Sequence, residues 1–325
     1  MTSMDLSIVI VNWNSFEFTK QCIVSLYSTI RDLRFEIIVV DNASTKDRLE
    51  LSKGLPQTVR VMQLETNLGF AGANNLGAAS STAALVLFLN PDTLVVGDAI
   101  ERLVTTLRNN PYLGALGCLL LNSDLTLQTS CVQAFPTISN QILALEWLIR
   151  RPALLRFWGL KALSSPPSSV PIDVDVVSGA CILVRRDVFD AVGGFGTQNF
   201  LYAEEVELCY KIRTLGRRVG HLNTAKIIHF GGRSTSQMTH AHSSVLMYQS
   251  VYKWLRNVRG SCYATAYRCL LLLSALLRLV ILVPLLLTPG ATRIKPACQR
   301  AFRKWWNVGA WTLLGSNLSS SHLTR

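Results

Sequence analysis

Amide and carboxylate side chains follow each of the first four predicted strands, which is where a parallel sheet places its ligands. Asparagine and aspartate are also ordinary turn formers, so one such strand end would carry little information. Four strand ends in a row favour a binding site at one edge of the sheet. The side chains are Asn12, Asp41, Asn67, Asn90 and Asp92, after strands expected at 6–11, 35–40, 59–64 and 84–89.

A second acidic group, Glu204, Glu205 and Glu207, opens a helix expected over 204–215. A carboxylate at such a place could remove a proton from a hydroxyl nucleophile as a general base. Acidic residues are also common in the first turn of a helix, where they offset the helix dipole, and Glu207 fits that simpler explanation. The pattern alone leaves both interpretations open for the other two carboxylates.

These side chains must be positioned by the alternating strands and helices of the first 120 residues. The strands are continuous apolar runs, as expected for strands that are buried on both faces. This alternation predicts a mostly parallel sheet covered by helices. Helices are expected at 15–30, 69–80 and 97–109, and further strands at 114–121, 174–184, 219–222 and 225–230. Beyond these, a further helix is expected at 240–259.

The chain of 325 residues has a formal charge of +12 that is unevenly spread. Residues 1–207 hold all 20 acidic and 15 basic residues, whereas residues 208–325 hold 17 basic residues. Such asymmetry suggests a polyanionic partner, either nucleic acid or an anionic membrane. The eight cysteines form no Cys-x-x-Cys pair and no signal peptide is recognisable, so we expect the N-terminal body to be cytoplasmic and reduced.

The segment 269–287 is apolar except for Arg278, and as a helix it would reach about 28 Å, nearly the thickness of a bilayer core. Basic residues flank it on both sides and Pro284 could turn it, which favours an in-plane or re-entrant anchor. A single transmembrane span and a buried helix of a soluble domain are the alternatives. Nucleic acid is disfavoured, because the basic residues enclose an apolar block. The tryptophans that would suit a membrane interface are Trp305, Trp306 and Trp311.

Eight short segments, in this order along the chain, resemble the motifs of glycosyltransferase family 2. The resemblance is to bacterial rhamnosyltransferases that build O-antigen, capsule or cell-wall polysaccharide. Each segment alone is a weak signal, but their order over about residues 5–236 is specific. The segments are 10–14, 39–44, 67–77, 89–92, 178–180, 192–195, 202–207 and 229–234.

The resemblance implies a GT-A-like α/β fold, with a Rossmann-like, mostly parallel sheet flanked by helices. It divides the chain into a catalytic domain at 1–239 and a basic, hydrophobic, membrane-associating helical region at 240–325. The implied activity is inverting transfer of L-rhamnose from dTDP-rhamnose, or of another nucleotide-activated hexose, onto a polyprenyl-diphosphate-linked saccharide. The enzyme would work on an anionic membrane surface at the cytoplasmic face, peripherally or monotopically, without nucleic acid and in an oligomeric state that the sequence leaves open.

For the donor, the resemblance implies that Asp92 binds a divalent metal, Mg²⁺ or Mn²⁺, with His229 as a further ligand or phosphate donor. Asn90 stands where a full Asp-x-Asp motif has its first acid, and it could hydrogen-bond ribose or water. Asp41 would accept a hydrogen bond from the N–H of a pyrimidine ring. The other implied nucleotide-sugar-binding residues are Asn12, Asn67 and Asn74.

For the acceptor, the resemblance implies that Glu205 is the catalytic base, with Glu204 and Glu207 in support and Arg233 near the diphosphate or acceptor. Glu205 stands where the family motif has an aspartate, which lengthens the reach of the carboxylate by roughly 1.5 Å. A catalytically inactive GT-A-fold scaffold at the membrane is the alternative that Asn90 and Glu205 leave open. A basic nucleic-acid-binding protein is a further, weaker alternative.

Overall fold

The computed structural model describes residues 4–45, 54–144, 151–198, 203–231, 240–288 and 295–315. The chain divides into two compact units, which we call the sheet unit and the helical unit. The sheet unit comprises Met1–Phe135, Arg150–Phe200 and Glu204–Thr235; the helical unit comprises Pro136–Ile149, Leu201–Ala203 and Ser236–Arg325. The helical unit thus includes the segment Pro136–Ile149, which the sequence analysis assigned to the catalytic domain.

Parallel strands form one half of the sheet in the sheet unit, as predicted. They are β1 (Leu6–Asn12), β2 (Phe35–Asp41), β3 (Val59–Gln63) and β4 (Leu85–Leu89), in the order β3-β2-β1-β4. Nearly all side chains of β1 and β4 are buried, which explains their continuous apolar sequences. Asn12 pairs with Asp41, and Asp41 pairs with Gln63, so these carboxyl ends meet at one edge.

The other half of the sheet is mixed. β10 (Cys181–Arg185) runs antiparallel between β4 and β6 (Leu113–Leu121), and β11 (Arg218–His229) runs parallel to β6. β5 (Thr93–Val96) and β8 (Ile172–Asp173) each pair with β11 in antiparallel fashion. Cys181, the first residue of β10, pairs with Leu89, the last residue of β4. The start of β10 therefore lies at the same edge as the ends of the parallel strands.

Two predicted strand regions differ in detail from the structure. The two strands expected at 219–222 and 225–230 form the single strand β11, whose register is irregular between Leu222 and Lys226. The region 174–184 contains β10 and the short β9 (Val176–Val177), which pairs with β7 (Val132–Gln133) in a separate two-stranded sheet. The short 3₁₀ segments are η1 (Thr129–Cys131), η2 (Pro152–Trp158) and η3 (Leu160–Ser164).

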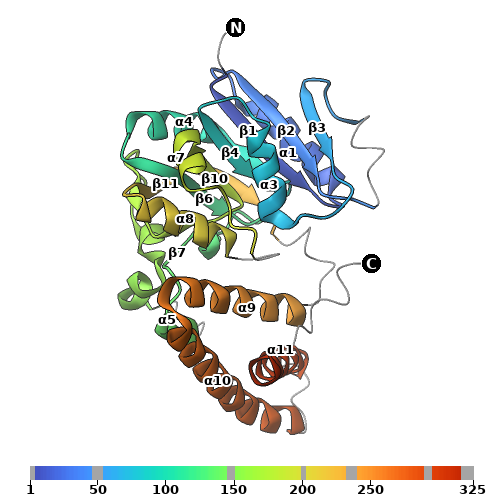
Figure 1. The fold of residues 1–325 in the computed structure, drawn as a ribbon, viewed down its shortest axis with the longest axis vertical. Helices are drawn as coiled ribbons and strands as arrows, with labels where there is room; N and C mark the ends of the chain where they lie inside the picture. The colour runs from blue at the N-terminus through green and yellow to red at the C-terminus, as the bar shows by residue number, and fades with distance from the viewer. Residues whose placement is uncertain are drawn as a thin grey trace. The chain divides into compact units, whose positions relative to one another are not determined.

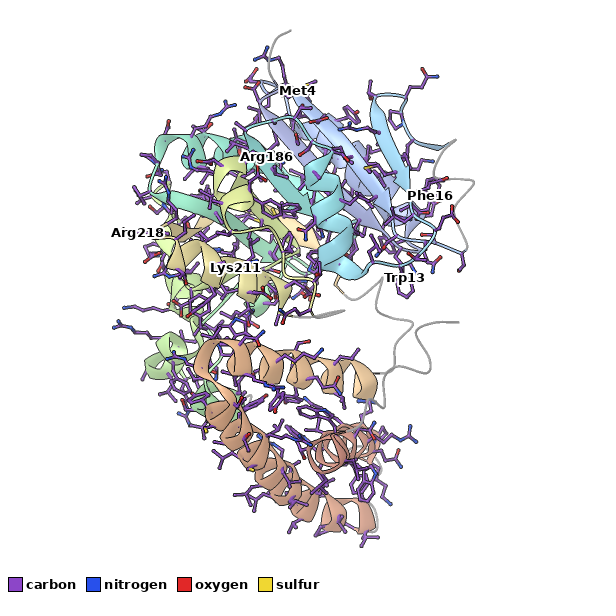
Figure 2. The ribbon with its side chains drawn as sticks, viewed as in Figure 1. Met4, Trp13, Phe16, Arg186, Lys211 and Arg218 are labelled. Atoms are coloured by element: carbon purple, nitrogen blue, oxygen red, sulfur yellow. The ribbon has the colours of Figure 1, made fainter. Side chains whose placement is uncertain are left out.

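Helices pack against the sheet, as Figure 1 shows for α3. α3 approaches closely because Gly77 has no side chain: a Cβ atom there would overlap Val9 of β1 and lie 3.1 Å from Val40 of β2. Arg186, labelled in Figure 2, donates to the carbonyl of Ala78 near the end of α3 at 2.8 Å. The helices are α1 (Phe16–Thr29), α3 (Gly69–Ala79), α4 (Ala99–Asn109), α7 (Arg186–Ala191) and α8 (Glu204–Thr214).

The helical unit contains α5 (Ile138–Ile142), α9 (His240–Arg259), α10 (Ser261–Leu287) and α11 (Lys295–Leu314). Within this unit the three long helices pack on one another, with α11 in the angle between α9 and α10 (Figure 1). Tyr267 and Ala275 of α10 are completely buried. The sequence analysis predicted α9 and the apolar part of α10, but not α11.

The three tryptophans of α11 do not share one environment. Trp306 is 60% exposed, whereas Trp311 is 5% exposed and packs edge-on against Tyr252. The ring of Trp305 lies within the unit, 6.0 Å from the ring of Tyr248. The expectation of an interfacial position was therefore wrong for Trp311, because its ring is buried within the unit, whereas Trp305 is half-buried.

Candidate active site

The side chains at the ends of β1 and β2 form one buried hydrogen-bond network. Asn12 Nδ2 donates to Asp41 Oδ1 at 2.9 Å and to Ser44 Oγ at 3.1 Å. Asn12 Oδ1 accepts from the hydroxyls of Ser15 and Thr19 at 3.1 and 2.8 Å. Asp41 is completely buried, yet its Oδ2 atom has no hydrogen-bond partner among the described residues. Since a buried acceptor without a donor costs free energy, this oxygen is suited to an incoming N–H group.

Two residues beside this network have a left-handed backbone. They are Asn14, with φ of 49°, and Ala43, with φ of 60°. The Asn14 N–H donates to Ser44 Oγ at 2.8 Å, and Asn14 Oδ1 accepts from the Thr45 N–H at 2.8 Å. Such backbone costs a residue other than glycine about 1–3 kcal/mol and persists where neighbouring contacts enforce it, often at functional sites. The loops after β1 and β2 are therefore held in one arrangement.

The end of β2 is also connected to the start of α3. Asn42 Nδ2 donates to Asn67 Oδ1 at 2.8 Å, and Asn42 Oδ1 accepts from the Leu68 N–H at 2.8 Å. Asn67 Oδ1 accepts from the Gly69 N–H as well, at 2.8 Å. Asn74 is buried and donates to the Phe70 carbonyl of its own helix at 3.0 Å. The structure thus joins Asn67 to the edge of the sheet through Asn42, while the reported bond of Asn74 stays within α3.

Three predicted donor-site residues meet after β4, although 139 positions separate Asn90 from His229. His229 Nε2 lies 3.4 Å from Asp92 Oδ1 and 3.4 Å from Asn90 Nδ2. Asp92 is 3% exposed, and its carbonyl accepts from the Phe230 N–H at 2.9 Å. The pairing of β5 with β11 brings these residues together, because it aligns Thr93 with His229.

Gln128 fixes the orientation of the His229 ring. Its Nε2 atom donates to the His229 carbonyl at 2.6 Å, so its Oε1 atom is the one that faces His229 Nδ1 at 3.0 Å. Because an amide oxygen only accepts, Nδ1 must carry a proton. In the neutral ring, Nε2 then presents a lone pair towards the Asp92 carboxylate. The Asn90 amide can donate to Nε2, and a proton on Nε2 or a metal ion would bring Nε2 and the Asp92 carboxylate into favourable contact.

A divalent metal fits this pair as an open site. Among the described residues, no group of three or more histidine, cysteine, aspartate or glutamate side chains could hold a metal ion. Mg²⁺ commonly takes one or two carboxylates and completes its coordination with substrate phosphates and water. The residues that would hold the metal are Asp92 and His229, with the diphosphate of a nucleotide supplying further oxygens.

Glu205 lies in the first turn of α8, beside the residues that precede β10. A Cβ atom on Gly179 would lie 3.6 Å from the Glu205 Cβ atom and 3.5 Å from the ring of Phe70. The next residue, Ala180, accepts the Asn90 N–H at 2.9 Å. The stretch Gly179–Ala180 therefore lies between the Glu205 Cβ atom and the Asn90–Asp92 segment. Burial raises the pKa of Glu205, because the charged form loses hydration.

The neighbouring acids differ from Glu205. Glu204 is 3% exposed. Glu207 packs against Gly196, where a Cβ atom would overlap its carboxylate, and lies 3.6 Å from Lys211 Nζ. Lys211, labelled in Figure 2, donates to the Gly194 carbonyl at 2.6 Å. Glu207 and Lys211 thus hold the segment 194–196. Arg233 lies outside the described residues.

Sequence reasoning missed two positioning side chains, Gln128 and Asn75. Asn75 bonds both backbone groups of Phe195, accepting the N–H at 2.9 Å and donating to the carbonyl at 2.8 Å. Asn75 and Phe195 both belong to recognised segments, so the pairing of those segments was a usable signal. Gln128 lies outside every segment and 101 positions from His229, and no local pattern marks it.

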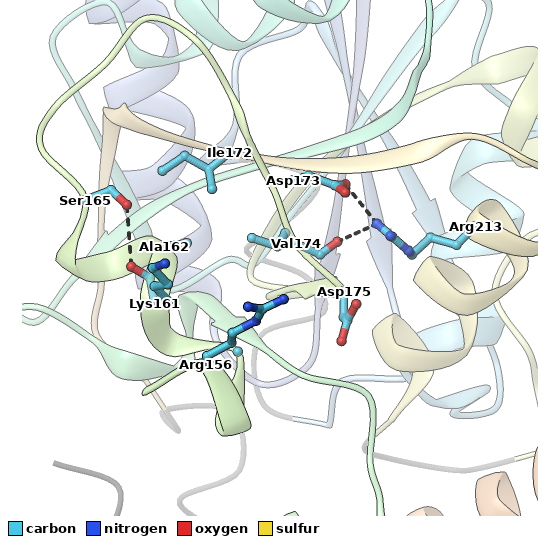
Figure 3. Close-up of a pocket in the computed structure, with 10 residues that line it drawn as sticks. Arg156, Lys161, Ala162, Ser165, Ile172, Asp173, Val174, Asp175 and Arg213 are labelled. Atoms are coloured by element: carbon cyan, nitrogen blue, oxygen red, sulfur yellow. Dashed lines mark hydrogen bonds and ion pairs between the residues drawn. The ribbon is translucent and has the colours of Figure 1, made fainter. Parts of the chain in front are cut away.

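A separate cavity of about 520 Å³ lies in the sheet unit, and Figure 3 shows its lining. Arg213 Nη1 donates to Asp173 Oδ1 at 2.8 Å and to the Val174 carbonyl at 3.0 Å. Asp175 Oδ2 accepts from the Phe135 N–H at 3.2 Å. None of the predicted site residues lines this cavity, and three of its charged residues, Asp173, Asp175 and Arg213, already have partners.

Comparison with known proteins places this geometry in context. The hexosyltransferase Agl10 of low-salt glycan biosynthesis in Haloferax volcanii is 29% identical over 229 residues, 69% of this chain and 67% of that protein. The N-acetylglucosaminyl-diphospho-decaprenol L-rhamnosyltransferase of Mycobacterium tuberculosis is 26% identical over 291 residues, 84% of this chain and 91% of that protein.

The fold is that of solved GT-A structures. The mannosyltransferase PcManGT from Pyrobaculum calidifontis, solved with GDP-Man and Mn²⁺, superposes with a TM-score of 0.58 at 14% identity, covering 97% of this chain and 89% of that one. The sequence also matches the profile described as glycosyl transferase family 2 over residues 7–193, more than half of its length. The chain therefore belongs to glycosyl transferase family 2, and it is a glycosyltransferase with a GT-A-like fold.

Proposed function

We propose that this enzyme transfers a hexose from a nucleotide sugar to a lipid-linked saccharide with inversion at the anomeric carbon. The observation that carries the proposal is the proximity of two groups at one sheet edge. The Asp92–His229 pair follows β4, and the Gly179–Ala180 stretch lies between its segment and the Glu205 Cβ atom. An inverting transferase needs a carboxylate base opposite a stabilised diphosphate leaving group.

The network around Asp41 supports a role in nucleotide binding. Asp41 Oδ2 would accept the N–H of a pyrimidine ring, and Asn12 holds the other carboxylate oxygen. Asn90 would contact the ribose or an ordered water. Asn67 would hold the start of α3 beside the nucleotide. Asn74 would stabilise the first turns of the same helix, because its side chain donates to the Phe70 carbonyl.

Asp92 and His229 would hold a divalent metal, Mg²⁺ or Mn²⁺. When bound, such a metal offsets the negative charge that develops on the departing diphosphate. The chain's own contribution is to hold the His229 ring so that Nδ1–H bonds to Gln128 and Nε2 is the nitrogen aimed at Asp92. Mn²⁺ in the complex of PcManGT supports this choice of cofactor.

Glu205 would accept the proton of the acceptor hydroxyl while that oxygen bonds to the anomeric carbon and the nucleoside diphosphate leaves. Its raised pKa strengthens it as a base relative to an ordinary glutamate. Glu204, Glu207 and Arg233 would support the acceptor side, Glu207 by holding the loop at Gly196.

We further propose that the donor is dTDP-L-rhamnose or another nucleotide-activated hexose, and that the acceptor is a saccharide on polyprenyl diphosphate. The name of the mycobacterial relative supports both parts. The basic C-terminal region supports an enzyme that works at the cytoplasmic face, where anionic lipids attract lysine and arginine.

A panel experiment tests the proposal. Purified protein in vesicles is incubated with Mn²⁺, polyprenyl-diphosphate-linked saccharides, and dTDP-rhamnose or UDP-hexoses. We expect transfer from one donor, loss of transfer in Glu205→Gln, and retention in Glu17→Gln, an exposed acid in the first turn of α1. Nucleotide binding without turnover on any donor and acceptor would show an inactive scaffold and overturn the proposal.

A further inference from the structure

One face of α10 is apolar and exposed from Leu270 to the end of the helix. Its large side chains are 42–75% exposed; they recur every three or four residues from Leu270 to Ile281, and Leu287 lies on the same side of the helix. Exposed apolar patches of this kind mark interaction sites. The residues are Leu270, Leu273, Leu276, Leu277, Val280, Ile281 and Leu287, which we call the outer face.

The charges of α10 point away from the outer face. Arg278 donates to Ser274 of its own helix and to the Ile142 carbonyl at 3.4 Å, and its guanidinium lies 4.3 Å from the ring centre of Trp305. Arg268 donates to the Thr312 carbonyl at 2.8 Å. Arg278 therefore does not oppose contact between the outer face and hydrocarbon, because the helical unit itself binds the guanidinium.

The packing of α10 argues against a transmembrane orientation. Its inner face contacts α9 and α11. These helices carry exposed basic side chains at Lys253, Arg256, Arg300 and Arg303. A spanning α10 would bring the helices packed on it to membrane depth, where such charges are costly. An α10 that lies along the surface buries only the outer face and leaves the basic residues near the headgroups.

Charge complementarity identifies the kind of surface. No acidic residue follows Glu207 in the sequence, so every charged residue of α9, α10 and α11 is basic. Anionic lipid headgroups attract such a unit, and hydrocarbon accepts its apolar side. Trp306, on α11, is 60% exposed and suits the boundary between the two.

We propose that the helical unit is a monotopic anchor that enters one leaflet of an anionic membrane, with α10 parallel to the surface and its outer face in the acyl region. Arg278 is then a structural residue that joins α10 to α11 and α5. The proposal concerns the partner of the helical unit and is independent of the roles assigned to Glu205 and Asp92.

Depth measurements test the orientation. Cys262 and Cys269 are exposed on α10 and suit thiol-reactive fluorophores. Single labels at Cys269, Leu277→Cys and Leu287→Cys, with the other exposed cysteines changed to serine, are compared by quenching with lipids that carry quenchers at known depths. Vesicles contain phosphatidylglycerol and phosphatidylcholine. We expect similar shallow depths at all three positions. A series in which depth changes steadily along the helix and passes the midplane would overturn the proposal.

Substitutions test the face itself. Leu273→Glu with Leu277→Glu should weaken co-sedimentation with phosphatidylglycerol vesicles by about tenfold or more, because two charges replace apolar side chains in the acyl region. Leu215→Glu is the matched control, since it places the same charge on an exposed leucine of the sheet unit. Circular dichroism checks that the double variant is folded. Undiminished vesicle binding by a folded double variant contradicts the proposal.

Discussion

At the scale of single residues, the donor site depends on the tautomer of one histidine. Gln128 has no catalytic chemistry of its own, but it holds His229 by two hydrogen bonds, from Nε2 to the backbone carbonyl and from the ring Nδ1 to Oε1. A metal ligand whose other ring nitrogen is fixed in this way binds more tightly than a freely rotating one. Gln128 is therefore a positioning residue.

Gln128→Leu should weaken Mn²⁺ binding in the presence of a nucleoside diphosphate by roughly 10- to 100-fold, because both hydrogen bonds to His229 are lost. Titration calorimetry measures the effect. Gln128→Glu keeps an acceptor for Nδ1–H and should retain more of the affinity than Gln128→Leu. Equal losses in both variants would show that Gln128 has only a packing role. As the control, nucleotide binding is measured with a chelator present, where the metal makes no contribution.

The carboxyl group of Glu205 should set the acidic limb of the pH–rate profile. Burial raises its pKa above the ordinary glutamate value of about 4.3, so the base becomes protonated at a higher pH than a solvent-exposed glutamate. We expect kcat/KM to fall below that raised pKa with a slope of about one. Glu205→Asp should retain the acidic limb of the profile and lower the rate, since the carboxylate is retained on a side chain that is one methylene shorter. A profile in Glu205→Gln with unchanged rate and limb contradicts the assignment.

At the scale of elements, α3 is positioned by its contact with β1 and β2. Gly77→Ala should destabilise the sheet unit by about 1–3 kcal/mol, because a methyl group would overlap Val9. Gly309→Ala in α11 is the matched control: its new Cβ atom would meet only Ala275 Cβ at 3.8 Å, and alanine favours a helix by about 0.5–1 kcal/mol. Urea unfolding of the two variants should therefore show shifts of opposite sign.

The strand β11 carries a buried histidine that makes the sheet unit sensitive to acid. His221 is completely buried between β6 and β8, where it pairs with Gly117 and Ile172, and neither ring nitrogen has a hydrogen-bond partner among the described residues. Burial lowers its pKa to about 4, below the ordinary value of about 6.5. Because the unfolded chain binds the proton first, the neutral ring contributes stability above pH 6.5 that is lost as the pH falls towards 4.

The lost free energy of unfolding amounts to about 3 kcal/mol across that window if the whole shift is realised. Unfolding by urea at a series of pH values measures it. His221→Leu should flatten the decline between pH 6.5 and 4, since leucine has a similar size and does not titrate. A decline of the same steepness in that variant would assign the acid sensitivity to other groups.

Local periodicity was enough to predict the four parallel strands and the helices α1, α3 and α4, because the burial of such an element shows in the residue types of a few consecutive positions. The apolar run at 85–89 predicted β4 well. The antiparallel insertion of β10 between β4 and β6, and the placement of β5 on β11, depend on pairings between distant segments that no local pattern encodes. The same reason hid Gln128, whereas Asn90, Asp92 and His229 belonged to recognised segments.

At the scale of the whole chain, the uneven charge assigns the candidate catalytic residues and the candidate membrane-binding residues to different parts of the sequence. The acidic residues that would act on substrates all lie at or before Glu207, and the basic residues of α9 and α11 lie in a different compact unit. Salt should therefore weaken membrane binding through screening without abolishing it, because the outer face of α10 contributes an apolar part that salt does not screen.

Two saccharide acceptors, one water-soluble and one lipid-linked, separate the effect of membrane binding from the effect of catalysis. Leu273→Glu with Leu277→Glu should leave transfer to a water-soluble, short-chain acceptor within about twofold of the unsubstituted protein, because neither leucine belongs to the sheet unit. Transfer to a polyprenyl-linked acceptor in vesicles should fall by about tenfold or more, since the enzyme no longer concentrates on the surface that holds the substrate. Radiolabelled sugar incorporation measures both rates, with Leu215→Glu as control. An equal fall on both acceptors would mean that the helical unit takes part in forming the catalytic site, and the division of labour argued from charge would then be wrong.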